Sequence, residues 1–71
     1  MSAKDLKRSV TIAGHRTSLS LEPEFWDALK ELAAQSGMAL PALIADIDGA
    51  RGGRNLSSAA RLRVLAWLKS R

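Results

Sequence analysis

Three polar side chains at every second position of the run HRTSLSL (residues 15–21) are the first candidates for chemistry. Arg16, Ser18 and Ser20 alternate there with threonine and leucine, so in an extended segment they share one face. A guanidinium donates two parallel hydrogen bonds to guanine in the major groove, and a hydroxyl bonds several bases. These residues are candidate base contacts in duplex DNA, and the alternative is the solvated outer face of a sheet.

The residue types present do not indicate a catalytic or a metal-binding site. The chain has no cysteine and a single histidine, His15, which we expect at the surface. Ser57 and Ser58 have no histidine or lysine close in sequence to act as a base. We therefore expect neither an enzyme nor a cofactor, and no small-molecule substrate.

Composition describes one small basic domain. The 71 residues carry 11 Lys and Arg against 7 Asp and Glu, for a net charge of +4 and a pI near 10.4, which favours polyanionic partners. Neither a signal peptide nor an apolar run long enough for a membrane span is visible. The expected location is the cytoplasm.

The elements that position these residues follow from hydrophobic periodicity. Residues 1–8, with Lys4, Lys7 and Arg8, are predicted to form a flexible basic arm, and residues 9–71 the domain. The run SVTIAGHRTSLSL alternates with period two, which predicts strand on both sides of Gly14. Gly14 fits either a hairpin turn or a bulge in one longer strand.

Three helices are predicted after the strand region. Pro23 suits the first position of one helix and Gly37 its left-handed end. A short helix follows from Leu40 to about Asp48 and is broken by DGARGGRN, and Asn55 is a good cap for a last helix. The two tryptophans, Trp26 and Trp67, fall on apolar helical stripes and are predicted in the core or at an interface rather than stacked on bases.

One charge lies where apolar residues are expected. Arg63 falls in the middle of the apolar face of the last helix, where an unpaired charge is costly. We therefore expect Asp46 or Asp48 to pair with Arg63, Arg51 or Arg54.

A strand or a single hairpin needs a partner, because its unpaired backbone groups and its apolar face require cover. The simplest partner is the same strand of a second copy, antiparallel across a two-fold axis. Leu19 and Leu21 of both chains would then cover the pooled helices, and the polar side chains would point outward from a ribbon that fits the major groove. This is an α+β fold.

The order of strand, proline, helix, glycine stop and second helix resembles the ribbon-helix-helix family of bacterial DNA-binding proteins. The runs RSVTIAGHRTSLSLEPEFWDALKELA and RNLSSAARLRVL resemble its short predicted DNA-binding subfamily over roughly residues 8–66. The resemblance implies an intertwined homodimer with a ribbon in the major groove, a role in transcription regulation, and base contacts by Arg16, Ser18 and Ser20. The implied dimer core comprises Leu19, Leu21, Phe25, Trp26, Leu29, Leu32 and Ile44.

The chain departs from the family pattern after Gly37. Many members begin the second helix with a hydroxyl residue whose helix N-terminus holds a phosphate, whereas this chain has Ala39 and Pro41. Backbone contacts to DNA would then come mainly from the basic arm and the RGGR loop, through Lys7, Arg8, Arg51 and Arg54. The third helix extends the minimal fold.

Two other functions stay open. An antitoxin of a toxin-antitoxin pair is one, although the chain ends on a predicted helix and not on the disordered tail with which such proteins wrap a toxin. A dimeric adaptor that has lost DNA binding and captures a protein through its third helix is the other.

Overall fold

The computed structural model describes residues 5–71, so Lys4 of the predicted arm lies outside the described residues. A two-stranded antiparallel sheet precedes three helices. The strands are β1 (Leu6–Ile12) and β2 (His15–Leu21), and the helices are α1 (Pro23–Gln35), α2 (Leu40–Ala50) and α3 (Leu56–Lys69). This α+β arrangement is the predicted fold class.

The two strands form a hairpin within one chain. Ala13 and Gly14 connect them with φ angles of 51° and 81°, and positive φ at both central residues defines the type I′ turn that matches strand twist. Gly14 is therefore a turn residue and not a bulge. β1 begins at Leu6, so Lys7 and Arg8 are paired in the ladder and do not belong to a free arm.

Local signals set the helix ends as predicted. Pro23 opens α1, and Gly37, at φ 69°, follows its end. The Asn55 side chain accepts a hydrogen bond of 2.8 Å from the backbone N–H of Ser58 at the start of α3. The second helix extends two residues beyond the predicted end, to Ala50.

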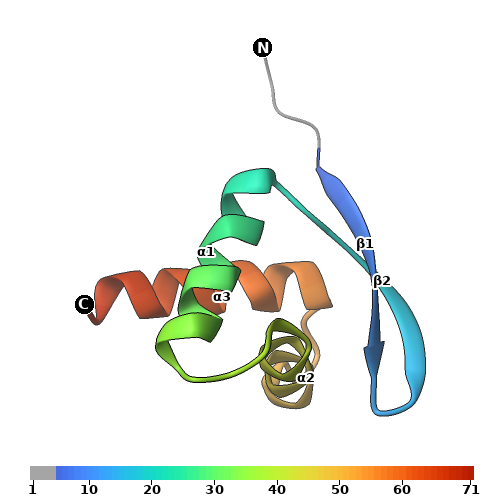
Figure 1. Cartoon of the computed structure of the whole chain (residues 1–71). Coiled ribbons are helices and arrows are strands. Elements are labelled where there is room, and N and C mark those ends of the chain that lie inside the picture. Colours follow the sequence, from blue (N-terminus) through green and yellow to red (C-terminus); the bar gives the residue numbers. More distant parts are fainter. Residues whose placement is uncertain (1–4) are drawn as a thin grey trace.

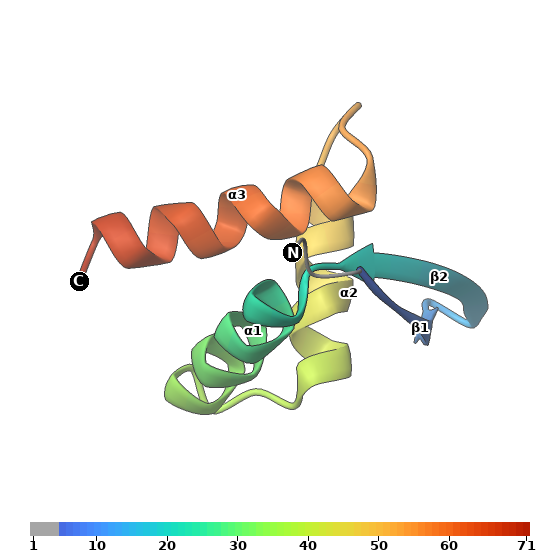
Figure 2. The ribbon, with the colours of Figure 1, turned by 90° about the horizontal axis from the view of Figure 1, so that it is seen from above.

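The hairpin lies on one side of the three helices, and α3 starts beside the hairpin and runs away from it toward the opposite side of the molecule (Figures 1 and 2). One apolar cluster draws side chains from all five elements. Its largest fully buried members are Trp26, Leu19, Leu21, Leu29, Leu43, Ile44, Ile47 and Val64. The inner face of the hairpin is thus part of the core.

A single chain already buries most of the residues predicted for a dimer core. Leu19, Leu21, Trp26, Leu29, Leu32 and Ile44 are buried within the chain, while Phe25 is partly buried with the Arg61 guanidinium 5.8 Å from its ring centroid. Their contribution to a dimer, and strand pairing across a two-fold axis, stay predictions.

Two ion pairs form among the residues predicted to pair, one between α2 and α3 and one at the end of α2. Arg63 contacts Asp46 at 2.8 Å, and Arg51 contacts Asp48 at 2.7 Å. The pair with Asp46 explains how an arginine is accommodated on the apolar side of α3, because its charge is matched at the edge of the helix interface.

Candidate nucleic-acid interface

The register of the hairpin sorts its side chains onto two faces. Cross-strand partners in an antiparallel pair point to the same side, and successive residues alternate. The outer face carries the pairs Lys7–Ser20, Ser9–Ser18 and Thr11–Arg16. The inner face carries Leu6–Leu21, Arg8–Leu19, Val10–Thr17 and Ile12–His15. The three predicted base contacts therefore share one face with three residues of β1.

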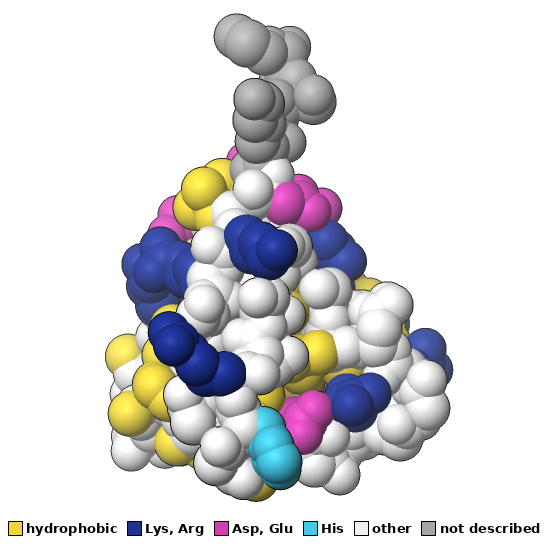
Figure 3. Space-filling view, turned by 90° about the vertical axis from the view of Figure 1, so that its right-hand side faces the viewer, with side chains coloured by type: hydrophobic (Ala, Val, Ile, Leu, Met, Phe, Trp, Pro, Cys, Tyr) yellow, Lys and Arg dark blue, Asp and Glu magenta, His cyan; other side chains and the backbone are white. Residues whose placement is uncertain are grey.

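All six outer-face side chains can form hydrogen bonds, and none is a carboxylate. Five are exposed to solvent and Ser20 is half-buried. Lys7 and Arg16 add two positive charges near opposite ends of the face. Viewed from the side on which the hairpin lies, the molecule shows several separate Lys and Arg side chains, with acidic and apolar side chains also visible between some of them (Figure 3).

Sequence reasoning missed Ser9 and Thr11 as members of this face. Their alternation with Val10 and Ile12 predicted a strand, which was the available signal. The two-residue turn at Ala13 and Gly14 puts Ser9 opposite Ser18 and Thr11 opposite Arg16. A bulge at Gly14 would instead have left all four residues on one long strand, where they could not pair with each other.

The two basic residues of β1 point to opposite sides of the hairpin. Lys7 lies on the outer face, beside Ser20. Arg8 lies on the inner face with its guanidinium 5.1 Å from the ring centroid of Trp26, and the indole Nε1–H donates to the Leu6 carbonyl oxygen at 2.9 Å. Of the two predicted backbone contacts in this segment, the structure brings only Lys7 to the outer face.

The loop between α2 and α3 uses one of its arginines internally. Arg51 donates from Nε to Asp48 at 2.7 Å and from a terminal nitrogen to the carbonyl oxygen of Arg54 at 2.6 Å. The Arg54 side chain is exposed and forms no ion pair with another described residue. Arg54 is thus the freer cation of the two.

The start of α2 lacks a phosphate-binding side chain, as predicted. Ala39 is its N-cap and gives no side-chain hydrogen bond, and a proline occupies the first turn. The start of α3 is polar by comparison and lies beside β2, where the Ser57 hydroxyl donates to the Ser20 carbonyl oxygen at 3.0 Å. An open hollow lies beside this contact. It is lined by Thr17, Ser18, Asp48, Arg51, Asn55, Leu56, Ser57, Ser58 and Arg61.

Acidic groups near the hairpin are held by Arg61 from α3. Its guanidinium lies 2.9 Å from a Glu22 carboxylate oxygen and 3.9 Å from that of Asp5. A hydrogen bond from the backbone of Glu22 itself, and then the hydrogen bond from Arg61, lower the pKa of the Glu22 carboxyl from its ordinary value of 4.5. These contacts tie α3 to the junction of β2 and α1.

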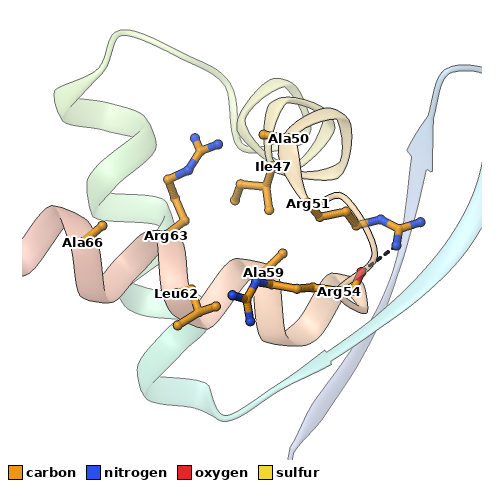
Figure 4. A pocket seen from close by; sticks show the side chains of 8 residues that line it. All are labelled: Ile47, Ala50, Arg51, Arg54, Ala59, Leu62, Arg63 and Ala66. Carbon is orange, nitrogen blue, oxygen red and sulfur yellow. Dashed lines mark hydrogen bonds between the residues drawn. The ribbon is translucent and has the colours of Figure 1, made fainter.

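A second hollow lies between α2 and α3, away from the outer face of the hairpin. It has a volume of about 250 Å³ and an apolar lining of Ile47, Ala50, Ala59, Leu62 and Ala66. Arg54 and Arg63 extend along two sides of these residues, whereas Arg51 points toward the Arg54 carbonyl (Figure 4). Leu62, Leu65 and Leu68, 41%, 50% and 48% exposed, continue the apolar surface along α3.

A family model described as ribbon-helix-helix domain matches residues 6–68. The chain belongs to this family, whose members are typically DNA-binding transcription regulators or antitoxins and typically not enzymes. No curated protein and no solved structure matches the chain. Within residues 5–71, no helix has the length and apolar character required to cross a membrane.

Proposed function

We propose that the protein is a sequence-specific double-stranded DNA-binding protein, acting as a homodimer with a β-ribbon in the major groove, and that it regulates transcription. The outer face of the hairpin is the observation that carries this proposal. Six hydrogen-bonding side chains, two of them cationic, share that face without a carboxylate or an apolar residue. Bacterial DNA as the partner would place the protein in the cytoplasm.

The dimensions of a two-stranded ribbon support insertion into DNA. Its strands lie about 4.8 Å apart, and the major groove is about 12 Å wide. Alternate residues along a strand are separated by about 6.8 Å, which is close to two base-pair steps of about 3.4 Å. Neighbouring outer-face side chains of one strand are therefore spaced to reach base pairs two steps apart and not the same one.

Each outer-face residue has a role that matches its chemistry. Arg16 can donate both hydrogen bonds of a bidentate contact to guanine, and Ser18 and Ser20 can bond several bases. Lys7 neutralises a phosphate, and Arg54 can do so from the α2–α3 loop. Affinity should come mainly from phosphate contacts, and discrimination from the hairpin.

The test is selection of duplexes from a random pool by the purified protein at two salt concentrations, followed by sequencing. The proposal expects a retained motif with two-fold symmetry and an affinity that falls steeply with salt. Arg16→Ala should relax the motif, whereas Lys30→Ala, which removes an exposed cation of α1, should leave it unchanged. Absence of any retained motif at low salt would overturn the proposal.

The exposed leucines favour a second candidate, a protein adaptor. Leu62 lines the hollow that Arg54 and Arg63 flank, and Leu65 is exposed three residues further along α3, so a helix with apolar and acidic side chains would complement this surface. A toxin would be one such partner. Leu65→Glu should abolish capture without affecting DNA binding, and an unchanged partner affinity would remove this candidate.

A further inference from the structure

We infer that two copies of the chain pair through β2 with Thr17 on the two-fold axis, and that Ser57 of α3 sets this register. Arg16 of one copy then lies directly opposite Ser18 of the partner subunit. The inference rests on the proposed homodimer and deepens it, because it names the residues at which the two strands meet. Members of the family typically bind DNA as dimers.

One edge of β2 has backbone groups that β1 does not use. In a two-residue hairpin the pair that flanks the turn is hydrogen-bonded, here Ile12 and His15. Hydrogen-bonded pairs recur at every second residue from there. The N–H and C=O groups of Arg16, Ser18 and Ser20 therefore point away from β1. A strand of the partner subunit that joins β2 has to pair with these groups.

The start of α3 occupies this edge at one end. The Ser57 hydroxyl donates to the Ser20 carbonyl oxygen at 3.0 Å, and a paired strand about 4.8 Å from β2 would compete with it for that oxygen. Thr17 and Ser18 instead line an open hollow of about 490 Å³. Outside the hairpin, no backbone hydrogen bond joins Arg16 or Ser18 to another described residue. The edge is thus occupied at Ser20 and open before it.

These constraints select one register. Centring a two-fold antiparallel pair on Ser18, or nearer to α1, would require the Ser20 carbonyl oxygen that α3 already binds. Centring it on Arg16 would pair Ser18 with Gly14, which lies in the turn at φ 81°. Centring it on Thr17 pairs Arg16 with Ser18 on both sides of the axis. All the free backbone groups of these two residues are then hydrogen-bonded.

The register gives the centre of the outer face a defined composition. Each Arg16 lies opposite Ser18 of the partner subunit, with Cα atoms about 5.5 Å apart. The two copies of Thr17, half-buried on the inner face, form a non-hydrogen-bonded pair with Cα atoms about 4.5 Å apart. Both β1 strands lie outside the central pair, so Lys7 is nearer to the phosphates at the groove edge than to the bases.

Disulfide cross-linking measures this register, because the chain contains no cysteine of its own. A disulfide requires Cα atoms about 4.4 to 6.8 Å apart, whereas diagonal neighbours two residues out of register are about 7 to 8 Å apart. Under mild oxidation, Thr17→Cys should therefore cross-link to its own copy at least about 10-fold faster than Ser18→Cys. Ser36→Cys, exposed and far from the hairpin in sequence, gives the rate of collisional cross-linking.

A mixture of two variants gives an independent measurement, which holds even if Thr17→Cys does not fold. Arg16→Cys and Ser18→Cys, mixed and oxidised, should form the mixed dimer in preference to either homodimer, because the two positions lie opposite each other only in the inferred register. Mass spectrometry distinguishes the three products, and circular dichroism checks the folding of each variant.

Ser57→Ala tests the role of α3. Ser58→Ala is its matched control, because the Ser58 hydroxyl forms no hydrogen bond with another described residue. Loss of the hydrogen bond to Ser20 should reduce the preference for cross-linking at Thr17 over Ser18 about 2- to 10-fold. The control should leave this preference unchanged.

The outcomes separate the inference from the proposed function. Faster cross-linking of Ser18→Cys than of Thr17→Cys would overturn the register, and an unchanged preference in Ser57→Ala would overturn the role of α3. If no variant cross-links faster than Ser36→Cys, the copies do not pair along this edge and the whole inference is overturned. Sequence-specific DNA binding is measured independently by the duplex selection, which requires no cysteine.

Discussion

Replacing Arg16 by alanine tests whether the hairpin reads bases or only binds phosphates. Arg16 is exposed on the outer face, next to Thr11, and forms no ion pair with a described residue. Its removal should change folding stability by less than about 0.5 kcal/mol. Any loss of binding can then be assigned to the contact with DNA.

The expected loss follows from the bidentate geometry. One such contact contributes about 1 to 3 kcal/mol of discrimination, so binding to the selected duplex should weaken about 5- to 150-fold. Binding to random duplex should change much less. The slope of log K against log salt should stay the same, because a base contact releases no phosphate counterion.

Lys7→Ala is the matched comparison on the same face. Lys7 lies opposite Ser20, near the end of the hairpin that joins the helices. Its loss should weaken binding to selected and random duplexes alike and reduce the salt slope by about 0.9, the value for one phosphate. Fluorescence anisotropy titrations over a salt series measure both quantities. If Arg16→Ala also lowers both affinities equally and flattens the slope, Arg16 contacts the backbone and the base-reading assignment is refuted.

Three further predictions concern the scaffold. Trp26→Phe should destabilise the fold by about 1 to 3 kcal/mol, because the buried indole loses its hydrogen bond to the Leu6 carbonyl, and urea denaturation should show a lower midpoint. Ala13→Asn should raise the melting temperature by a few degrees, because asparagine tolerates the positive φ of this turn position better than alanine; an unchanged or lower value would contradict the turn assignment. The pKa of Glu22 is lowered in the folded state, so its stabilising contribution is present at neutral pH and lost as the pH falls through that lowered pKa. Wild type should therefore lose more stability than Glu22→Gln between neutral pH and a pH well below 4.5, and equal losses would exclude a stabilising pair with Arg61.

Signals that act within a few residues were readable from the sequence. Pro23, Gly37 and Asn55 each determine a helix end by their own backbone or side-chain chemistry, and the structure has each where predicted. The ion pair of Arg63 with Asp46 is one of the pairings that the sequence predicts between Asp46 or Asp48 and the three nearby arginines, because an arginine on an apolar stripe requires a carboxylate nearby.

Features that depend on register were not readable. Nothing local distinguishes a turn from a bulge at Gly14, so the position of Ser9 and Thr11 opposite β2 stayed open. The charges of Lys7 and Arg8 led to the prediction of a flexible arm, although both residues belong to β1. This strand extends back to Leu6 because β2 offers pairing partners as far as Leu21. Register is a property of two segments, and periodicity describes only one.

The register also links stability to reading. A slip by one residue would exchange the buried and outer faces of β2, taking Leu19 and Leu21, now 1% and 0% exposed, into solvent. Burial of two leucines contributes about 3 to 6 kcal/mol, whereas one bidentate base contact contributes about 1 to 3 kcal/mol. The free energy of a single base contact therefore does not offset the loss of leucine burial that a slip would cause. The core determines which side chains face DNA before DNA is bound. A substitution at Leu19 should accordingly change the DNA sequence preference only when it also lowers the free energy of unfolding. A substitution at Arg16 should change the preference at nearly unchanged stability.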